Sequence, residues 1–250
     1  MVIRKLSLDE WFLQYQLRKI RRDAFHLNLI LKVDVSSLFQ KYLAAGQKMP
    51  VNILVLKALG RTAVQHPHFS RMGFRSLWGA RFLESSEIRI NFPIEIEHHG
   101  RQITTAIVIK NPDSKSPTEL SEEIKSAKSR PLESFPISNF AHSRKNNFAN
   151  RLALRLLHRF IMSSPQRYFK MGGGGLSFSS MTQVKIPHSI LTSIALGPTG
   201  FTFCLNSVEM IGDGTFLHFG IGFDHNCHTG SEMARFMKAF SENLSTDPIL

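Results

Sequence analysis

FLHFGIGFDHNCHTG, residues 216–230, combines the end of a strand with the start of a helix. Its apolar first part is typical of a strand that ends at Asp224-His225, and Thr229-Gly230 then opens an amphipathic helix. A histidine at such a corner can face a cleft while its backbone stays rigid, which suits a general base. A histidine at a strand end is more often structural than catalytic, so these residues alone leave both roles open for His225.

The neighbouring residues predict further strands and a closing helix. Strands are expected at about 189–196, 201–210 and 215–224, with Asp213-Gly214 as a hairpin turn. The closing helix is indicated by an apolar stripe at helical spacing, formed by Met233, Phe236, Met237, Phe240 and Leu244.

Four glycines, 172–175, precede another strand-like segment, 176–180. A glycine-rich turn can cradle a phosphate when a Lys-Ser/Thr pair or a helix follows it. Neither follows here, so the P-loop and dinucleotide-binding interpretations fail, and a flexible entry to a strand is expected.

The N-terminal half predicts the same mixture of elements. Period-two alternation indicates the strands, and Ser36-Ser37 and Ser116 followed by Glu119 are helix-capping patterns. Pro93 removes a ladder donor, so its strand is expected at an edge or at a bulge. The expected elements are helices at 8–24, 36–45, 50–66 and 117–129, a strand at 27–35, and a hairpin at 87–109 that turns at His99-Gly100-Arg101. Together they predict one α/β domain over residues 1–250.

The composition restricts the class of protein. The chain has 250 residues, two cysteines and a net charge of +12. No apolar run is long enough to predict a membrane span, and the charged N-terminus lacks a secretory signal. Two cysteines make no disulfide framework, which favours a reducing cytoplasm. The charge could attract a polyanion, but no nucleic-acid-binding motif accompanies it, so no nucleic-acid partner is expected.

Residues 148–163 predict a basic amphipathic helix. Arg151, Arg155 and Arg159 recur every four residues, and Leu152, Leu156 and Phe160 supply an apolar side. A surface helix that packs on its own domain is one interpretation. Docking of an acidic partner or a membrane surface is the other.

The histidine segment also excludes two kinds of site. Asp224, His225, Cys227 and His228 all lie within five residues and lack the second, well-separated ligand pair of a zinc site, so no metal is expected. Cys227 as a nucleophile has no supporting signature. A general base would need an oxyanion donor elsewhere, and Ser179 or Ser180 in the glycine-led strand could supply it.

The order of segments resembles the catalytic domain of the dihydrolipoamide acyltransferases of 2-oxo-acid dehydrogenase complexes, which belong to the chloramphenicol acetyltransferase-like superfamily. GGGGLSFSSM resembles the family's GGTFTISNLGM, and the segment from Asp224 resembles its DHRxxDGxxxAxFL. The remaining matching segments are LILKVDVSSL, PVNILVLKALGRTAVQHP and EIRINFPIEIEHHGRQITTAIVIKNPDSKSPTELSEEI. The resemblance implies a two-layer α/β sandwich with a central mixed sheet and flanking helices.

The resemblance also implies an activity. Family members transfer an acyl group between coenzyme A and an acceptor thiol, hydroxyl or amine, without an acyl-enzyme. The motif histidine, here His225, removes the acceptor's proton. A Ser or Thr hydroxyl from a neighbouring subunit stabilises the oxyanion, a role that falls on Ser179, or on Ser180 if the register slips by one. Homotrimers with sites at the subunit interfaces are implied.

Two positions depart from the family's motif. The Arg after the histidine is Asn226 here, and the Asp before Gly230 is Thr229. Thr229 and Glu232 still predict a capping box for the last helix, but the carboxylate charge is lost. A catalytically decayed trimeric scaffold or binding protein is therefore the alternative to an enzyme.

No lipoyl domain, subunit-binding domain or Ala/Pro linker is expected within the chain, and no covalently bound lipoyl group. The acyl donor or acceptor is then a separate molecule. Coenzyme A or acyl-coenzyme A is expected as a substrate, with an acidic acyl-carrier protein or a separate lipoyl domain as partner. The residues that would bind coenzyme A are not assigned by the sequence.

Overall fold

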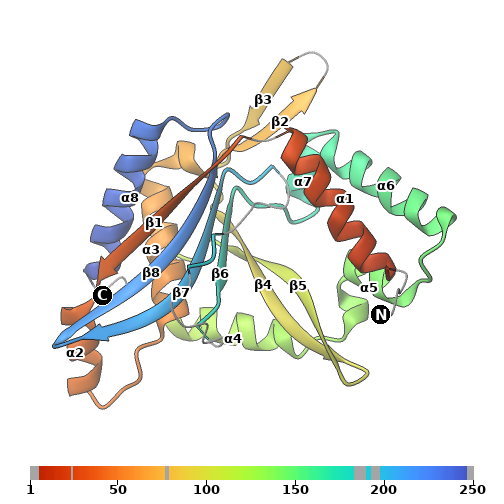
Figure 1. Cartoon of the computed structure of the whole chain (residues 1–250). Helices are drawn as coiled ribbons and strands as arrows, with labels where there is room; N and C mark the ends of the chain where they lie inside the picture. Colours follow the sequence, from red (N-terminus) through yellow and green to blue (C-terminus); the bar gives the residue numbers. More distant parts are fainter. Residues whose placement is uncertain (1–5, 24, 77–78, 183–189, 193–197, 247–250) are drawn as a thin grey trace, which may run out of the picture.

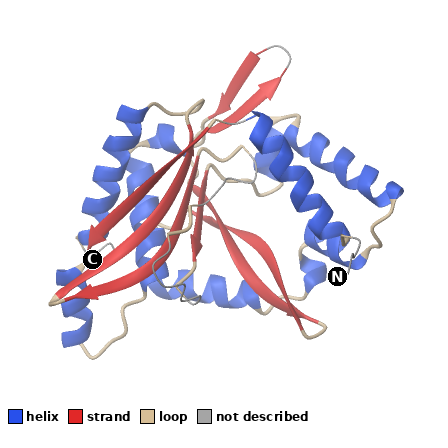
Figure 2. Cartoon of the chain, viewed as in Figure 1, coloured by secondary structure: helices blue, strands red, loops and turns tan. Residues whose placement is uncertain are grey.

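The computed structural model describes residues 6–23, 25–76, 79–182, 190–192 and 198–246. Helices and strands alternate as the sequence predicts (Figures 1 and 2). The helices are α1 (Leu8–Asp23), α2 (Ser36–Ala44), α3 (Val51–Gln65), α4 (Pro117–Lys128), α5 (Pro136–Ser143), α6 (Phe148–Met162), α7 (Pro165–Lys170) and α8 (Gly230–Ser245), with 3-10 turns η1 (Pro67–Ser70) and η2 (Leu132–Ser134). The strands are β1 (His26–Asp34), β2 (Met72–Ser76), β3 (Gly79–Leu83), β4 (Arg89–His98), β5 (Arg101–Lys110), β6 (Leu176–Ser180), β7 (Phe201–Ile211) and β8 (Gly214–Asp224).

A six-stranded mixed sheet forms the centre, in the order β1-β8-β7-β6-β4-β5. Strand β6 runs parallel to both β4 and β7, and the other pairs are antiparallel. Strands β2 and β3 form a separate hairpin, which the sequence analysis missed. The α/β architecture with a central mixed sheet is therefore confirmed.

The main core lies between this sheet and the helices α3 and α8, which lie side by side in Figure 1. Phe201, Phe203 and Phe219 point from the strands toward these helices, where they meet Phe236 and Phe240 of α8. All five are fully buried. The apolar stripe predicted for the closing helix is thus the face that covers the sheet.

A second group of helices, α1, α5, α6 and α7, lies on the opposite side of the molecule (Figure 1). It has its own small core, in which Leu8 and Phe12 of α1 meet Leu154 of α6. Arg89 of β4 links it to the sheet, because its guanidinium donates to the Phe169 carbonyl oxygen and lies 3.4 Å from the Phe169 ring centre.

The glycine run before β6 is a place of close backbone packing. A Cβ atom on Gly175 would lie 1.8 Å from the Ser70 carbonyl oxygen, and one on Gly174 would lie 2.6 Å from the Arg89 carbonyl oxygen. A Cβ on Gly173 would meet the Tyr168 ring at 2.1 Å. Because these glycines have no side chains, the Ser70 and Arg89 backbone and the Tyr168 ring can pack directly against the start of β6.

Some local predictions were wrong by small amounts. Ser36 does not cap α2, because its hydroxyl donates to Asp34 and accepts the Thr215 N–H at 2.8 Å. The β7–β8 turn is Gly212-Asp213, one residue earlier than predicted, with Gly212 at a φ of 57°. Of the strand predicted at 189–196, residues 190–192 are irregular, and the rest lies outside the described residues.

The proline prediction depends on where the pairing of β4 ends. Strand β6 pairs with β4 only at Ile90 and Asn91, so Pro93 has a ladder partner on the β5 side alone. The predicted edge or bulged position was nevertheless wrong, because β4 lies between β6 and β5 and pairs with β5 without a bulge. Pro93 is tolerated there because β6 does not pair with β4 at this residue.

Gly175→Ala should destabilise the protein by about 3 kcal/mol or more, since its methyl group would overlap the Ser70 carbonyl oxygen. Gly230→Ala is the matched control, because nothing lies within 4 Å of a Cβ there. Urea unfolding followed by circular dichroism measures both. Equal stability of the Gly175→Ala and Gly230→Ala variants would contradict the close-packing account.

Candidate active site at the end of strand β8

His225 lies at the corner directly after β8, with its side chain exposed to solvent. Its backbone N–H donates to the Phe25 carbonyl oxygen at 2.8 Å, which fixes the corner to the start of β1. The imidazole ring centre lies 6.0 Å from the ring centre of Phe25 and 6.2 Å from that of Phe223. The hydrogen-bonded backbone of this corner thus presents an exposed imidazole.

Asp224 holds this corner together. Its Oδ1 accepts the Phe25 N–H at 3.1 Å, the Asn226 N–H at 3.0 Å and the Asn226 side-chain amide at 2.6 Å. The Asp224 carboxylate therefore stabilises the backbone turn after β8. Phe25 was missed by the sequence analysis, although the pairing of β1 with β8 would have revealed it, because His26 lies opposite Asp224.

Thr229 caps α8, which confirms the predicted capping box. Its hydroxyl accepts the Glu232 N–H at 3.3 Å, and Glu232 accepts the Thr229 N–H at 2.8 Å. The Thr229 N–H bond lowers the pKa of Glu232. Thr229 therefore supplies the N-cap of α8, and Gly230 follows as the first residue of the helix.

His228 and Cys227 belong to the same segment but point into the core. The His228 ring is 2% exposed, stacks on Phe69 at 5.2 Å, and neither of its nitrogens has a hydrogen-bond partner among the described residues. Burial, with a smaller contribution from the Arg71 charge, lowers its pKa to about 3. Cys227 is also buried, and its thiol donates to Asp224 Oδ2 at 3.9 Å. Neither side chain is accessible to a substrate.

Ser179 lies on the face of the sheet opposite α3 and α8. In β6, Leu176 and Phe178 are buried toward the helices, so Ser177 and Ser179 alternate to the other face. The Ser179 hydroxyl donates to the Phe203 carbonyl oxygen at 3.4 Å, a long bond that a better acceptor could replace. Ser180 is paired with the Thr182 hydroxyl at 3.0 Å.

The sheet register separates Ser179 from His225 within one chain. Ser179 lies opposite Cys204 on β7, and Cys204 lies opposite Gly220 on β8. Gly220 is five residues before His225, which is about 17 Å along a strand. Ser179 is also two strands away, about 10 Å across the sheet. One chain therefore does not bring the predicted base and the predicted oxyanion donor together.

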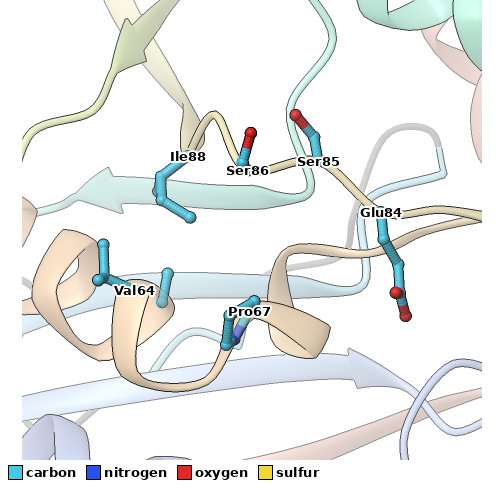
Figure 3. A pocket seen from close by; sticks show the side chains of 7 residues that line it. Val64, Pro67, Glu84, Ser85, Ser86 and Ile88 are labelled. Atoms are coloured by element: carbon cyan, nitrogen blue, oxygen red, sulfur yellow. The ribbon is translucent and has the colours of Figure 1, made fainter.

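A separate surface pocket of about 360 Å³ lies between the end of α3 and the segment that joins β3 to β4 (Figure 3). Its lining residues are Ala63, Val64, Pro67, Glu84, Ser85, Ser86 and Ile88. Neither His225 nor Ser179 contributes to it. The Ser85 hydroxyl accepts the Glu87 N–H at 3.1 Å, so it supports the local turn.

Acid should destabilise the protein through His228. Because its folded pKa lies below the ordinary 6.5, the stability that neutral His228 provides is complete above pH 6.5 and is lost as the pH falls toward 3. The free energy of unfolding, measured by urea titration, should therefore fall with decreasing pH in both proteins. The slope should be steeper in the wild type than in His228→Leu, by about 1.4 kcal/mol per pH unit. Identical slopes in the two proteins between pH 6 and about pH 4 would contradict this.

No protein-family model and no curated protein sequence matches the chain. Several solved structures share its fold. Azotobacter vinelandii dihydrolipoamide acetyltransferase is 18% identical at a TM-score of 0.67 and covers 98% of this chain and 92% of its own. A truncated catalytic core of the Thermoplasma acidophilum 2-oxoacid dehydrogenase multienzyme complex is 14% identical at a TM-score of 0.68, with 99% of both chains covered.

Chloramphenicol acetyltransferase is 15% identical at a TM-score of 0.54, with 96% of this chain and 99% of its own covered. Within the described residues, no helix is long and apolar enough to cross a membrane. The fold that the sequence resemblance implied is confirmed: the chain has the chloramphenicol acetyltransferase-like fold of these acyltransferase cores along nearly its whole length.

Proposed function

We propose that this chain is a coenzyme A-dependent acyltransferase in which His225 is the general base. The observation that carries the proposal is the exposed His225 imidazole at the end of β8. Its backbone N–H donates to the Phe25 carbonyl oxygen, and the Phe25 N–H donates to the carboxylate of the adjacent Asp224. The same fold occurs in acetyltransferases over nearly the whole chain, which supports acyl transfer as the class of reaction.

The proposed reaction needs one base and one oxyanion donor. His225 takes the proton of an acceptor thiol, hydroxyl or amine while the acceptor attacks the thioester carbonyl carbon of acyl-coenzyme A. The carbonyl oxygen becomes an oxyanion, which the Ser179 hydroxyl stabilises by donating a hydrogen bond, with Ser180 as the fallback. Collapse of the tetrahedral species expels the coenzyme A thiolate, which recovers the proton from His225. No acyl-enzyme is formed.

The distance between His225 and Ser179 in one chain makes the proposed site a shared one. A Ser179 from a neighbouring subunit would complete the site of each His225, and a closed trimer supplies three such pairs. Membership of the Thermoplasma acidophilum relative in a multienzyme complex core is consistent with assembly of this fold.

The Azotobacter vinelandii enzyme supports the proposed roles and also marks a difference. Its structural study concerned the roles of a serine, a histidine and, four residues after the histidine, an asparagine in catalysis. The corresponding spacing from His225 leads to Thr229, whose hydroxyl is engaged in the α8 capping box. Any contribution of an amide or carboxylate at this position is therefore absent here.

The basic surface suits phosphorylated or acidic partners. A net charge of +12 favours the phosphates of coenzyme A, an acidic acyl-carrier protein or a separate lipoyl domain. The acceptor and donor are proposed to be separate molecules in a reducing cytoplasm, where an acceptor thiol stays reduced.

A trimeric scaffold without catalysis is the second candidate, and one observation favours it. Both altered motif positions have structural duties, since Asn226 binds Asp224 and Thr229 caps α8. Calorimetry with coenzyme A and acyl-coenzyme A separates the two functions: an enzyme binds at least one of them, and a scaffold binds neither at millimolar concentration.

His225→Ala should lower acyl transfer at least about a hundredfold, because it removes the general base. Release of coenzyme A thiol from a panel of acyl-coenzyme A substrates, with dihydrolipoamide as the acceptor probe, measures the rate. His99→Asn is the matched control: His99 is an exposed histidine at the β4–β5 turn, with a φ of 49° that asparagine tolerates. Unchanged turnover in folded His225→Ala would remove the proposed mechanism.

A further inference from the structure

Helix α6 turns an apolar face to solvent. Leu154, His158 and Ile161 are its buried residues, whereas Leu152, Leu156 and Phe160 are 42%, 55% and 56% exposed. At about 100° per residue, these exposed side chains fall on the side of the helix opposite Leu154. The helix does pack on its own domain, as one interpretation expected, but Leu154, His158 and Ile161 hold it in place rather than Leu152, Leu156 and Phe160.

The arginines of α6 form one border of this apolar face. Arg151 and Arg155 lie over the Trp11 ring of α1, at 5.5 Å and 5.1 Å from its centre. Arg159 follows one turn later and is exposed. On the far side of the face, the Arg167 guanidinium of α7 lies 4.2 Å from the Phe160 ring centre. Cations thus flank an open apolar surface.

Residues 134–170 contain no Asp or Glu, and they contain seven Lys or Arg residues, namely Arg144, Lys145, Arg151, Arg155, Arg159, Arg167 and Lys170. None of the seven forms a salt bridge within the described part of the chain. A surface of this kind carries positive charge that remains available to an anionic partner.

We propose that the outward face of α6 docks on a membrane surface that carries anionic lipids. An amphipathic helix that lies in the plane of a bilayer buries apolar side chains at the headgroup boundary while its cations meet lipid phosphates. Leu152, Leu156 and Phe160 supply the apolar part, and Arg155 and Arg159 supply the charge. This inference is independent of the proposed acyl transfer.

The charge pattern favours a lipid surface over a second copy of the chain. Two copies that met through this face would bring together segments without a single carboxylate between residues 134 and 170. The net charge of +12 adds repulsion between copies, whereas an anionic bilayer attracts the same residues. The position of α6 at the margin of the molecule, away from α2, α3 and α8, leaves it accessible to a flat surface (Figure 1).

Vesicle flotation with the purified full chain tests the proposal. Vesicles of phosphatidylcholine alone are compared with vesicles that also contain phosphatidylglycerol, at low and high ionic strength. Three variants are tested: Leu156→Gln with Phe160→Gln removes apolar contacts, Arg159→Gln removes one charge, and Leu43→Gln is the control. Leu43 is an equally exposed leucine, 59%, on the distant helix α2. Thermal melts establish that each variant is folded.

The wild type should float with phosphatidylglycerol vesicles, and less so as salt is added. The double variant should bind at least about tenfold more weakly, Arg159→Gln about fivefold more weakly, and Leu43→Gln as well as the wild type. Failure of the wild type to float overturns the proposal, as does undiminished binding of the double variant. A lower oligomeric state of the double variant in sedimentation, without vesicle binding by the wild type, would assign this face to contacts between copies.

Discussion

Strand β6 joins the two halves of the central sheet, and the fold depends on the close backbone packing at the start of this strand. Strands β1, β8 and β7 lie on one side of β6 and strands β4 and β5 on the other. The chain reaches β6 through glycines that leave no room for side chains, with the Ser70 backbone on Gly175 and the Tyr168 ring on Gly173. The Gly175 carbonyl oxygen also accepts the Gly200 N–H at 3.0 Å, so the same short stretch fixes the start of β7.

The direction of β6 determines where chemistry can occur. Because β6 runs parallel to β7 and away from the His225 end of the sheet, Ser179 lies opposite Cys204, some way along the sheet from His225. The face that Ser179 occupies carries small residues, and Gly220 there lies under the Leu191 backbone. Ser179 is two strands away from His225 and about five residues further along the sheet, so the proposed reaction requires His225 of one chain and Ser179 of another. The proposed function and the proposed assembly therefore depend on each other.

Local interactions made much of the fold predictable. Strand alternation and two capping boxes, Ser116 with Glu119 and Thr229 with Glu232, depend on residues close in sequence. The prediction failed where distant contacts decide. The Ser36 hydroxyl accepts the Thr215 N–H instead of capping α2. The packing of α1 on Leu154 determines which side of α6 is buried. Similarly, the position of His225 was predicted, but its attachment to Phe25 required the β1–β8 pairing.

Activity of mixed assemblies tests the central claim most directly, namely that each site combines His225 of one chain with Ser179 of another. His225→Ala and Ser179→Ala chains, each inactive alone, are unfolded, mixed in equal amounts and refolded together. In a trimer with sites between subunits, every mixed trimer regains one complete site of three, so about a quarter of the wild-type activity should return. No recovered activity from mixed trimers that are shown to have formed would contradict the account.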